Sequence, residues 1–112
     1  MSDAAVIHRL AEVSRMLDAA TAEIAALDED AVRAKSRYEV AFAKSFVTTD
    51  GSNEMRKQVT VLRVQDEHLA VMLAEQKVRA CQERIRTLRS QIEVGRSLNA
   101  AYRAEMTAGM ST

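Results

Sequence analysis

Apolar residues recur along this chain at the spacing of long amphipathic helices. The first such stretch, residues 3–47, contains no proline or glycine, and the second, residues 54–106, contains Gly95 as its only glycine and no proline. The densest cluster of turn-forming residues, residues 48–53, lies between them. Apolar positions every three or four residues predict helix, and a short polar link between two helices predicts an antiparallel hairpin. We therefore predict an all-α fold, with one helical-hairpin domain over residues 1–112.

The apolar stripe of the first stretch follows a heptad rule for about five heptads, as in a coiled coil. Its members are spaced alternately four and three residues apart: Val6, Leu10, Val13, Leu17, Ala20, Ile24, Leu27, Ala31, Ala34, Tyr38 and Ala41. Ser2 or Asp3 is placed to cap the start of this helix. The acidic run Asp28–Asp30 is also typical of a helix start, so a kink or break near Leu27 is an alternative to a continuous helix.

The link between the two helices carries its own capping signals. Gly51 accepts the positive φ that commonly ends a helix. Ser52 or Asn53 then offers an N-cap for the second helix, with Glu54 favourably placed in its first turn. We therefore expect the turn at residues 48–53.

The second helix, expected over about residues 54–106, carries two apolar stripes. One comprises Met55, Val59, Leu62, Leu69 and Leu73, with Asp66 interrupting it. The other runs from Val64 and Val71 through Ala74, Val78, Cys81, Ile85, Leu88, Ile92, Gly95, Asn99, Tyr102 and Met106. Two stripes can serve two partners, the hairpin mate and another subunit. We expect a homo-oligomer whose interface uses Val78, Ile85, Leu88, Ile92, Asn99 and Tyr102. The tail, residues 107–112, has no pattern and is expected to fray.

Composition narrows the functional classes. Apolar residues make up 47% of the chain but aromatic residues only 4%, which fits long helices better than a compact mixed fold. Two helices bury little surface, so self-association is expected to complete the core. The single cysteine, Cys81, leaves no intrachain disulfide and suits a reducing compartment. Neither a signal peptide nor an apolar run of about 20 residues is present, so we expect a cytoplasmic protein without membrane contact.

The sequence offers little for catalysis. His8 and His68 lie on different predicted helices, and neither has a histidine or cysteine three or four residues later, the local spacing of many metal sites. Cys81 falls on an apolar stripe and is expected to be a small core residue. No glycine-rich phosphate loop or nucleophile motif occurs. We therefore expect no catalytic residue, no metal, no cofactor and no enzymatic activity.

The formal charge of zero hides a gradient along the chain. Residues 1–31 carry seven acidic and two basic side chains, a net charge of −5, whereas residues 76–103 carry seven basic and two acidic ones, a net charge of +5. Such an asymmetry predicts either an anion-binding half or an acidic half that pairs with a basic half.

The basic half contains a regular row of arginines. Arg89, Arg96 and Arg103 are seven residues apart and lie beside the apolar stripe, and Arg86 widens the row. Guanidinium groups suit bidentate phosphate contact, and such a row can follow a nucleic-acid backbone without reading bases. The alternative is pairing with acids of the first helix and with Glu75, Glu83 and Glu93, as on many coiled-coil flanks.

The order of elements from about Ser36 to Glu105 resembles the UvsY family of phage recombination mediators. The likeness rests on Arg37-Tyr38-Glu39, the Phe42–Phe46 segment, the Asp50-Gly51-Ser52 turn, Glu54-Met55-Arg56 and the basic segment 95–103. The chain is also similar to small all-helical proteins of actinobacterial phages and prophages, which implies the host cytoplasm. The first 35 residues lie outside the likeness.

The resemblance implies a ring-like or barrel-like homo-oligomer that binds single-stranded DNA. Such a protein helps to load a recombinase onto strands coated by single-strand-binding protein. On charge alone, we assign phosphate contact to Arg86, Arg89, Arg96 and Arg103, with Arg56 and Lys57 as secondary candidates. The second hypothesis is a coiled-coil protein-binding module, an adaptor, inhibitor or assembly factor, that does not bind nucleic acid.

Overall fold

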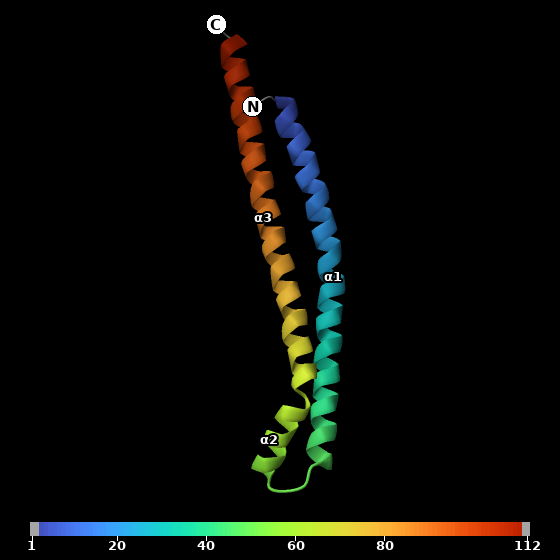
Figure 1. Ribbon diagram of the computed structural model, residues 1–112. Helices are drawn as coiled ribbons and strands as arrows, with labels where there is room; N and C mark the ends of the chain where they lie inside the picture. The colour runs from blue at the N-terminus through green and yellow to red at the C-terminus, as the bar shows by residue number, and fades with distance from the viewer. Residues whose placement is uncertain (1–2, 111–112) are drawn as a thin grey trace. The chain divides into compact units, whose positions relative to one another are not determined.

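The computed structural model describes residues 3–110, which form three α-helices and no strand. They are α1 (Asp3–Thr48), α2 (Asn53–Arg63) and α3 (Gln65–Met110) (Figure 1). The predicted all-α class is confirmed. No described helix is both long enough and apolar enough to cross a membrane.

The heptad stripe of the first stretch is confirmed as the inner face of α1. None of its eleven members, from Val6 to Ala41, is exposed. Helix α1 continues through Asp28–Asp30, so the alternative break near Leu27 is not found. Of the two residues expected to cap this helix, Ser2 lies outside the described residues, and α1 begins at Asp3.

The turn between α1 and α2 follows its sequence signals. Gly51 has a φ of 112°, a conformation that glycine adopts without steric cost. The Ser52 hydroxyl accepts a hydrogen bond from the Met55 amide at 3.2 Å, so Ser52 is the N-cap of α2. The cap satisfies one of the amide groups that have no partner at a helix start.

The expected second helix is interrupted at Val64, so its prediction as one continuous element is wrong. Val64 has φ −101° and ψ 19° and separates α2 from α3. Hydrogen bonds continue on both sides of the break, from the Val64 amide to the Thr60 carbonyl and from the His68 amide to the Val64 carbonyl, both at 3.0 Å.

Two carboxylates lie just after Val64. Asp66 and Glu67 occupy the first turn of α3, where carboxylates interact favourably with the positive end of the helix dipole. They stabilise the start of α3, whereas the acidic run Asp28–Asp30 does not interrupt α1. The far end of α3 also differs from expectation, because helix extends to Met110 where residues 107–112 were expected to fray. The last two residues, 111–112, lie outside the described range.

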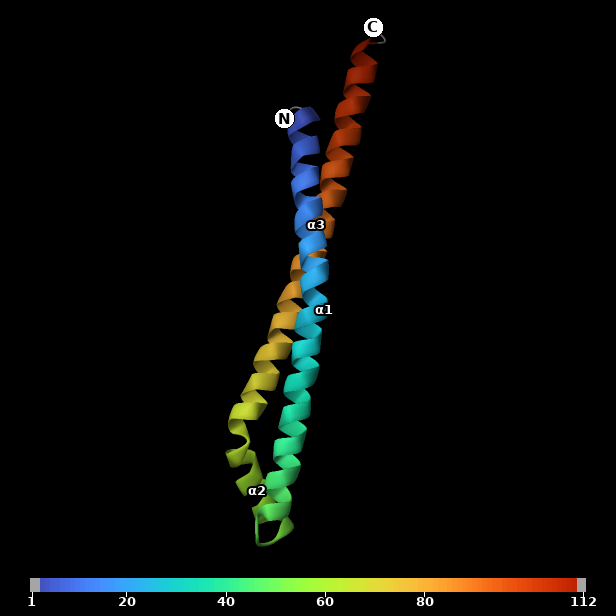
Figure 2. The same cartoon turned by 90° about the vertical axis from the view of Figure 1, so that its right-hand side faces the viewer.

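The chain divides into two compact units. Unit one combines α1 up to Glu23 with α3 from Cys81 onwards, and unit two comprises Ile24–Ala80. The single hairpin domain stays a prediction, and the two units are described separately. Within each, a segment of α1 lies beside a segment of α3 (Figures 1 and 2).

Unit one is held by two antiparallel helix segments. Ala20 lies beside Cys81, whose thiol donates to the Ala20 carbonyl oxygen at 3.4 Å. Leu10 lies against Gly95, and a Cβ on that glycine would come within 2.5 Å of Leu10 Cδ2. The buried apolar side chains of this unit are Val6, Val13, Ala20, Cys81, Ile85 and Leu88.

Unit two packs α1 against α2 and the start of α3. Its buried residues are small: Ala31, Ala34, Thr60, Val64 and Val71. The Tyr38 ring stacks on the imidazole of His68 at a centroid distance of 5.1 Å. Arg63 Nη1 donates to Thr49 Oγ1 at 3.0 Å and links the end of α2 to the residue after α1.

Candidate functional site

The arginine row, defined as Arg89, Arg96 and Arg103, lies exposed along α3 in unit one. Steps of seven residues place successive guanidinium groups roughly 10 Å apart along the helix axis. Within the part of the chain that the structure describes, none of the three forms an ion pair or a hydrogen bond through its side chain. The row therefore presents three guanidinium groups to solvent.

Two neighbouring arginines of α3 behave differently. Arg84 forms an ion pair with Glu23 of α1, and Arg86 forms one with Glu83 of α3. Arg86 was expected to widen the phosphate-binding surface, but its charge is partly compensated by Glu83. The alternative of pairing with acids thus holds for Arg84 and Arg86 and fails for the arginine row.

The two flanks of the helix pair explain this difference. Arg84 and Glu23 lie on one flank of the core and form an ion pair between the two helices. Residues that border the core of a coiled coil commonly pair in this way. By its heptad positions the arginine row belongs to the opposite flank, and the matching positions of α1 are Ile7, Ser14 and Thr21. None of these three residues is acidic, so α1 supplies no carboxylate at the matching positions.

One carboxylate does lie at pairing distance in sequence from the row. Glu93 follows Arg89 by four residues and precedes Arg96 by three, spacings that permit ion pairs on a helix. The structure shows no such pair among the described residues. Because exposed helical pairs contribute only about 0.3–0.5 kcal/mol, Glu93 competes weakly with a phosphate for these arginines.

The secondary candidates Arg56 and Lys57 have separate surroundings in unit two. Arg56 donates to the Phe46 carbonyl oxygen from Nε at 3.1 Å and from Nη2 at 2.8 Å. Its guanidinium carbon also lies 4.3 Å from the centroid of the Phe46 ring. Arg56 thus satisfies a carbonyl in the last turn of α1, a structural role that the sequence reading missed. Lys57 is exposed.

Replacing Arg56 with alanine is expected to lower the free energy of unfolding by about 1 kcal/mol. The variant loses a hydrogen bond from a charged donor to a carbonyl near the end of α1. Urea denaturation followed by circular dichroism measures the change. The matched control is Lys57→Ala, whose exposed side chain should leave stability within about 0.5 kcal/mol of wild type. An equal loss in both variants would contradict the capping role.

The stripe assigned to an oligomer interface is instead the inner face of α3. Ile85 and Leu88 are buried within unit one, together with Cys81. Ile92, Asn99 and Tyr102 are half-buried on the same face, and so is Val78 in unit two. The buried members are covered by the chain itself, which corrects their assignment to contact with another subunit.

The other apolar stripe of the second half, which begins at Met55, is largely exposed. Leu62, Leu69 and Leu73 are 72%, 49% and 55% exposed, and Met55 is exposed as well. Large apolar side chains in solvent are common singly, but a contiguous group marks an interaction surface. The exposed apolar side chains of the second half thus lie on different residues from those assigned to an interface.

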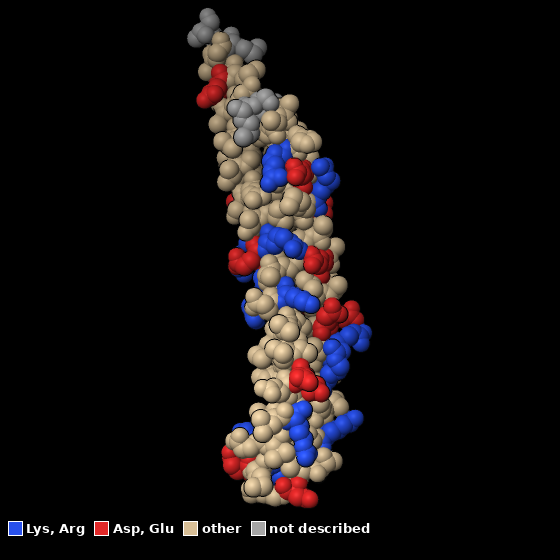
Figure 3. Space-filling view, viewed as in Figure 1, with Lys and Arg blue, Asp and Glu red and all other residues tan. Residues whose placement is uncertain are grey.

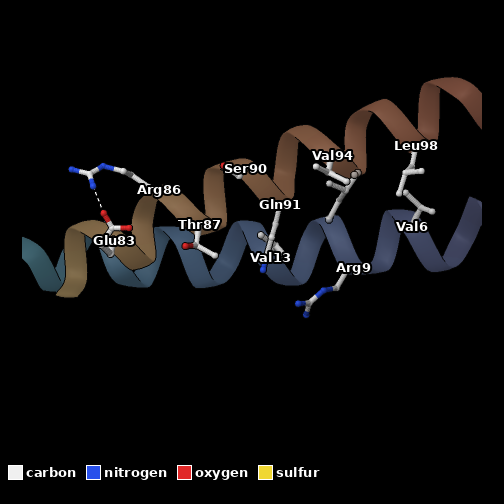
Figure 4. A pocket seen from close by; sticks show the side chains of 12 residues that line it. Val6, Arg9, Val13, Glu83, Arg86, Thr87, Ser90, Gln91, Val94 and Leu98 are labelled. Atoms are coloured by element: carbon white, nitrogen blue, oxygen red, sulfur yellow. Dashed lines mark hydrogen bonds and ion pairs between the residues drawn. The ribbon is translucent and has the colours of Figure 1, made fainter. Parts of the chain in front are cut away.

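Unit one also contains a shallow groove between α1 and α3 (Figure 4). Its volume is about 660 Å³. The apolar part of its lining comprises Val6, Leu10, Val13, Val94, Gly95 and Leu98. Figure 4 shows Val6 of α1 and Leu98 of α3 pointing toward one another across it. The sequence pattern gave no sign of this groove, because it depends on how closely two distant helix segments approach.

Two of the residues considered for catalysis have structural contacts. Cys81 is buried, and His68 is stacked on Tyr38. Over the described residues, no cluster of three or more His, Cys, Asp or Glu side chains is arranged to hold a metal ion.

Comparisons with known proteins found no matching family model, no matching curated protein and no matching solved structure. The likeness to the UvsY family is therefore a hypothesis carried by residues 36–105 alone.

Proposed function

We propose that this chain is a non-enzymatic, self-associating helical protein that binds the phosphate backbone of single-stranded DNA through the arginine row. The carrying observation is the contrast along one helix: Arg84 and Arg86 are paired with carboxylates, whereas the arginine row is not. Unpaired guanidinium groups retain their capacity for charge-assisted hydrogen bonds to phosphate.

The spacing of the row favours a backbone ligand over a single small anion. Three groups spread over roughly 21 Å of helix cannot converge on one phosphate, but they can contact successive phosphates of an extended strand. The net charge of zero gives no general attraction for polyanions, so binding depends on this local row. Assistance in loading a recombinase onto strands covered by single-strand-binding protein follows from the UvsY likeness alone.

Fluorescence anisotropy with a labelled single-stranded oligonucleotide tests the proposal. We expect binding that weakens steeply with salt, because each neutralised phosphate releases counterions. The triple variant Arg89→Gln, Arg96→Gln and Arg103→Gln should lose roughly tenfold or more in affinity at low salt. Its slope of log affinity against log salt should fall by about 0.7 for each lost contact.

The matched control is the triple variant Arg15→Gln, Arg37→Gln and Arg79→Gln, which removes the same charge from exposed positions outside the row. It should bind like wild type. Glu93→Gln, which removes the carboxylate beside the row, should bind more tightly than wild type. Equal losses in both triple variants, or no binding by wild type at low salt, would contradict the proposal.

A coiled-coil protein-binding module is the second candidate function. The exposed apolar side chains of Leu69 and Leu73 favour it, because they lie one turn apart on α3 and exposed apolar surface is typical of contacts between proteins. Under this function the arginine row serves solubility or ion pairs with a partner. The same anisotropy titration separates the two candidates, since a purely protein-binding module shows no salt-sensitive affinity for the oligonucleotide.

A further inference from the structure

One face of α3 in unit one is free of charge over five turns. The outward positions from residue 87 to residue 104 away from the arginine row are Thr87, Ser90, Gln91, Val94, Ser97, Leu98, Ala101 and Ala104. We call them the uncharged face. All charged residues of this segment lie elsewhere around the helix. Figure 3 shows the C-terminal part of α3 mostly tan.

This uncharged face differs from ordinary solvated helix surface. The positions of the same helix face one or two heptads earlier carry the charged residues Lys77, Glu83 and Arg84. Exposed helix faces of monomeric proteins carry charges, whereas interface cores are depleted of them. The uncharged face spans roughly 26 Å of helix, the length of an interhelical contact.

The uncharged face contains a heptad stripe of its own. Thr87, Gln91, Val94, Leu98 and Ala101 are spaced alternately four and three residues apart, the spacing that keeps one stripe toward a partner helix. Val94 and Leu98 are 59% and 51% exposed and border the groove against α1. The flanking Ser90, Ser97 and Ala104 are small enough for a second helix to approach closely.

The charges at the two ends of the stripe indicate which helix fits. Arg84 lies three residues before Thr87, and Glu105 lies four residues after Ala101. Among the described residues, Glu105 forms no ion pair. Arg84 and Arg86 each pair with one carboxylate of their own chain, but a guanidinium group has five N–H donors and can bind a second carboxylate. A second copy laid antiparallel brings Glu105 of one chain to these two arginines of the other. A parallel copy would place like charges together, which is unfavourable.

We propose that the uncharged face docks against the uncharged face of a second copy of this chain, with the two α3 helices antiparallel. This inference rests on the self-association part of the proposed function and names its surface. The contact is isologous, with the same patch used on both chains. Its two-fold axis passes near Val94, midway between Arg84 and Glu105. The arginine row lies outside the contact, so both chains keep it available.

Disulfide trapping tests the geometry directly, because a disulfide requires the two Cα atoms to approach within about 7 Å. In a Cys81→Ser background, a single Val94→Cys should cross-link to its own copy on mild oxidation. Thr87→Cys and Ala101→Cys should each fail alone but cross-link to one another when the two chains are mixed. Equal self-cross-linking at all three positions, or none at position 94, overturns the antiparallel contact.

Analytical ultracentrifugation separates this inference from the broader proposal. Val94→Glu with Leu98→Glu should raise the dimer dissociation constant at least tenfold while circular dichroism shows unchanged helix content. The control pair Leu69→Glu and Leu73→Glu alters equally exposed residues outside the uncharged face and should dimerise like wild type. Dissociation by the control pair alone overturns the inference and leaves self-association standing. A wild-type chain that stays monomeric overturns both this inference and the self-association in the proposed function, whatever its affinity for DNA.

Discussion

Replacing Leu88 with alanine is expected to lower the free energy of unfolding by about 2–5 kcal/mol. Leu88 is 4% exposed and lies in the core of unit one. Its truncation removes buried apolar surface and leaves a cavity that surrounding side chains fill only in part. Because domains of this size are stabilised by only about 5–15 kcal/mol in total, the loss should be obvious in a urea melt followed by circular dichroism.

Urea melts at several protein concentrations show whether Leu88 packs within its own chain or at an interface between chains. If the residue packs within its own chain, the loss relative to wild type is the same at every concentration. An oligomer-interface residue would show a loss that changes with concentration, because assembly shifts apparent stability by mass action. The matched control is Leu73→Ala, whose side chain is 55% exposed and whose loss should stay within about 0.5 kcal/mol. Equal losses in Leu88→Ala and Leu73→Ala would contradict the assigned core.

The position of the apolar stripes around each helix could be predicted from the sequence. Alternating steps of four and three residues from Val6 to Ala41 mark the inner face of α1, and the same steps from Val71 to Tyr102 mark one stripe of α3. In both cases the spacing alone is sufficient, because a helix repeats its faces every three to four residues. The turn at residues 48–53 could also be predicted, since Gly51 and Ser52 have conformational roles that few other residues fill.

Which of the two stripes of the second half packs inward could not be predicted. The leucine-rich stripe with Leu62, Leu69 and Leu73 looks more apolar, yet it is exposed. The inner face of α1 carries Ala31 and Ala34 where large side chains would be expected, which favours a partner surface of small residues. The shapes of the two facing helices, rather than apolar content alone, decide which stripe packs inward.

The candidate site could be predicted from the sequence only in part. A row of arginines is visible in the sequence, but whether each one is paired depends on which flank of α1 it meets. Arg84 meets Glu23, whereas the α1 positions that match the arginine row in the heptad pattern carry no carboxylate. The structural role of Arg56 required the chain reversal at residues 48–53 to bring it to Phe46.

Replacing Thr60 with valine is expected to raise the free energy of unfolding by about 1–3 kcal/mol. Thr60 is 0% exposed and lies on the inner face of α2 in unit two. Its hydroxyl oxygen has no hydrogen-bond partner within the described residues, and a buried polar group without a partner is costly. Valine has nearly the same shape and carries a methyl group in place of the hydroxyl, so the cavity stays filled while the desolvation cost disappears.

Thr21→Val provides the matched control, since it makes the same chemical change at an exposed helical position. The Thr21 hydroxyl donates to the Leu17 carbonyl oxygen at 2.8 Å, and its removal should change stability by no more than about 0.5 kcal/mol. Paired urea melts of both variants and wild type measure the difference. Stabilisation by Thr60→Val, with no gain from Thr21→Val, would show that burial of the unpaired Thr60 hydroxyl costs folding free energy. A net loss at Thr60 would show that the hydroxyl has a hydrogen-bond partner in solution and would contradict the prediction.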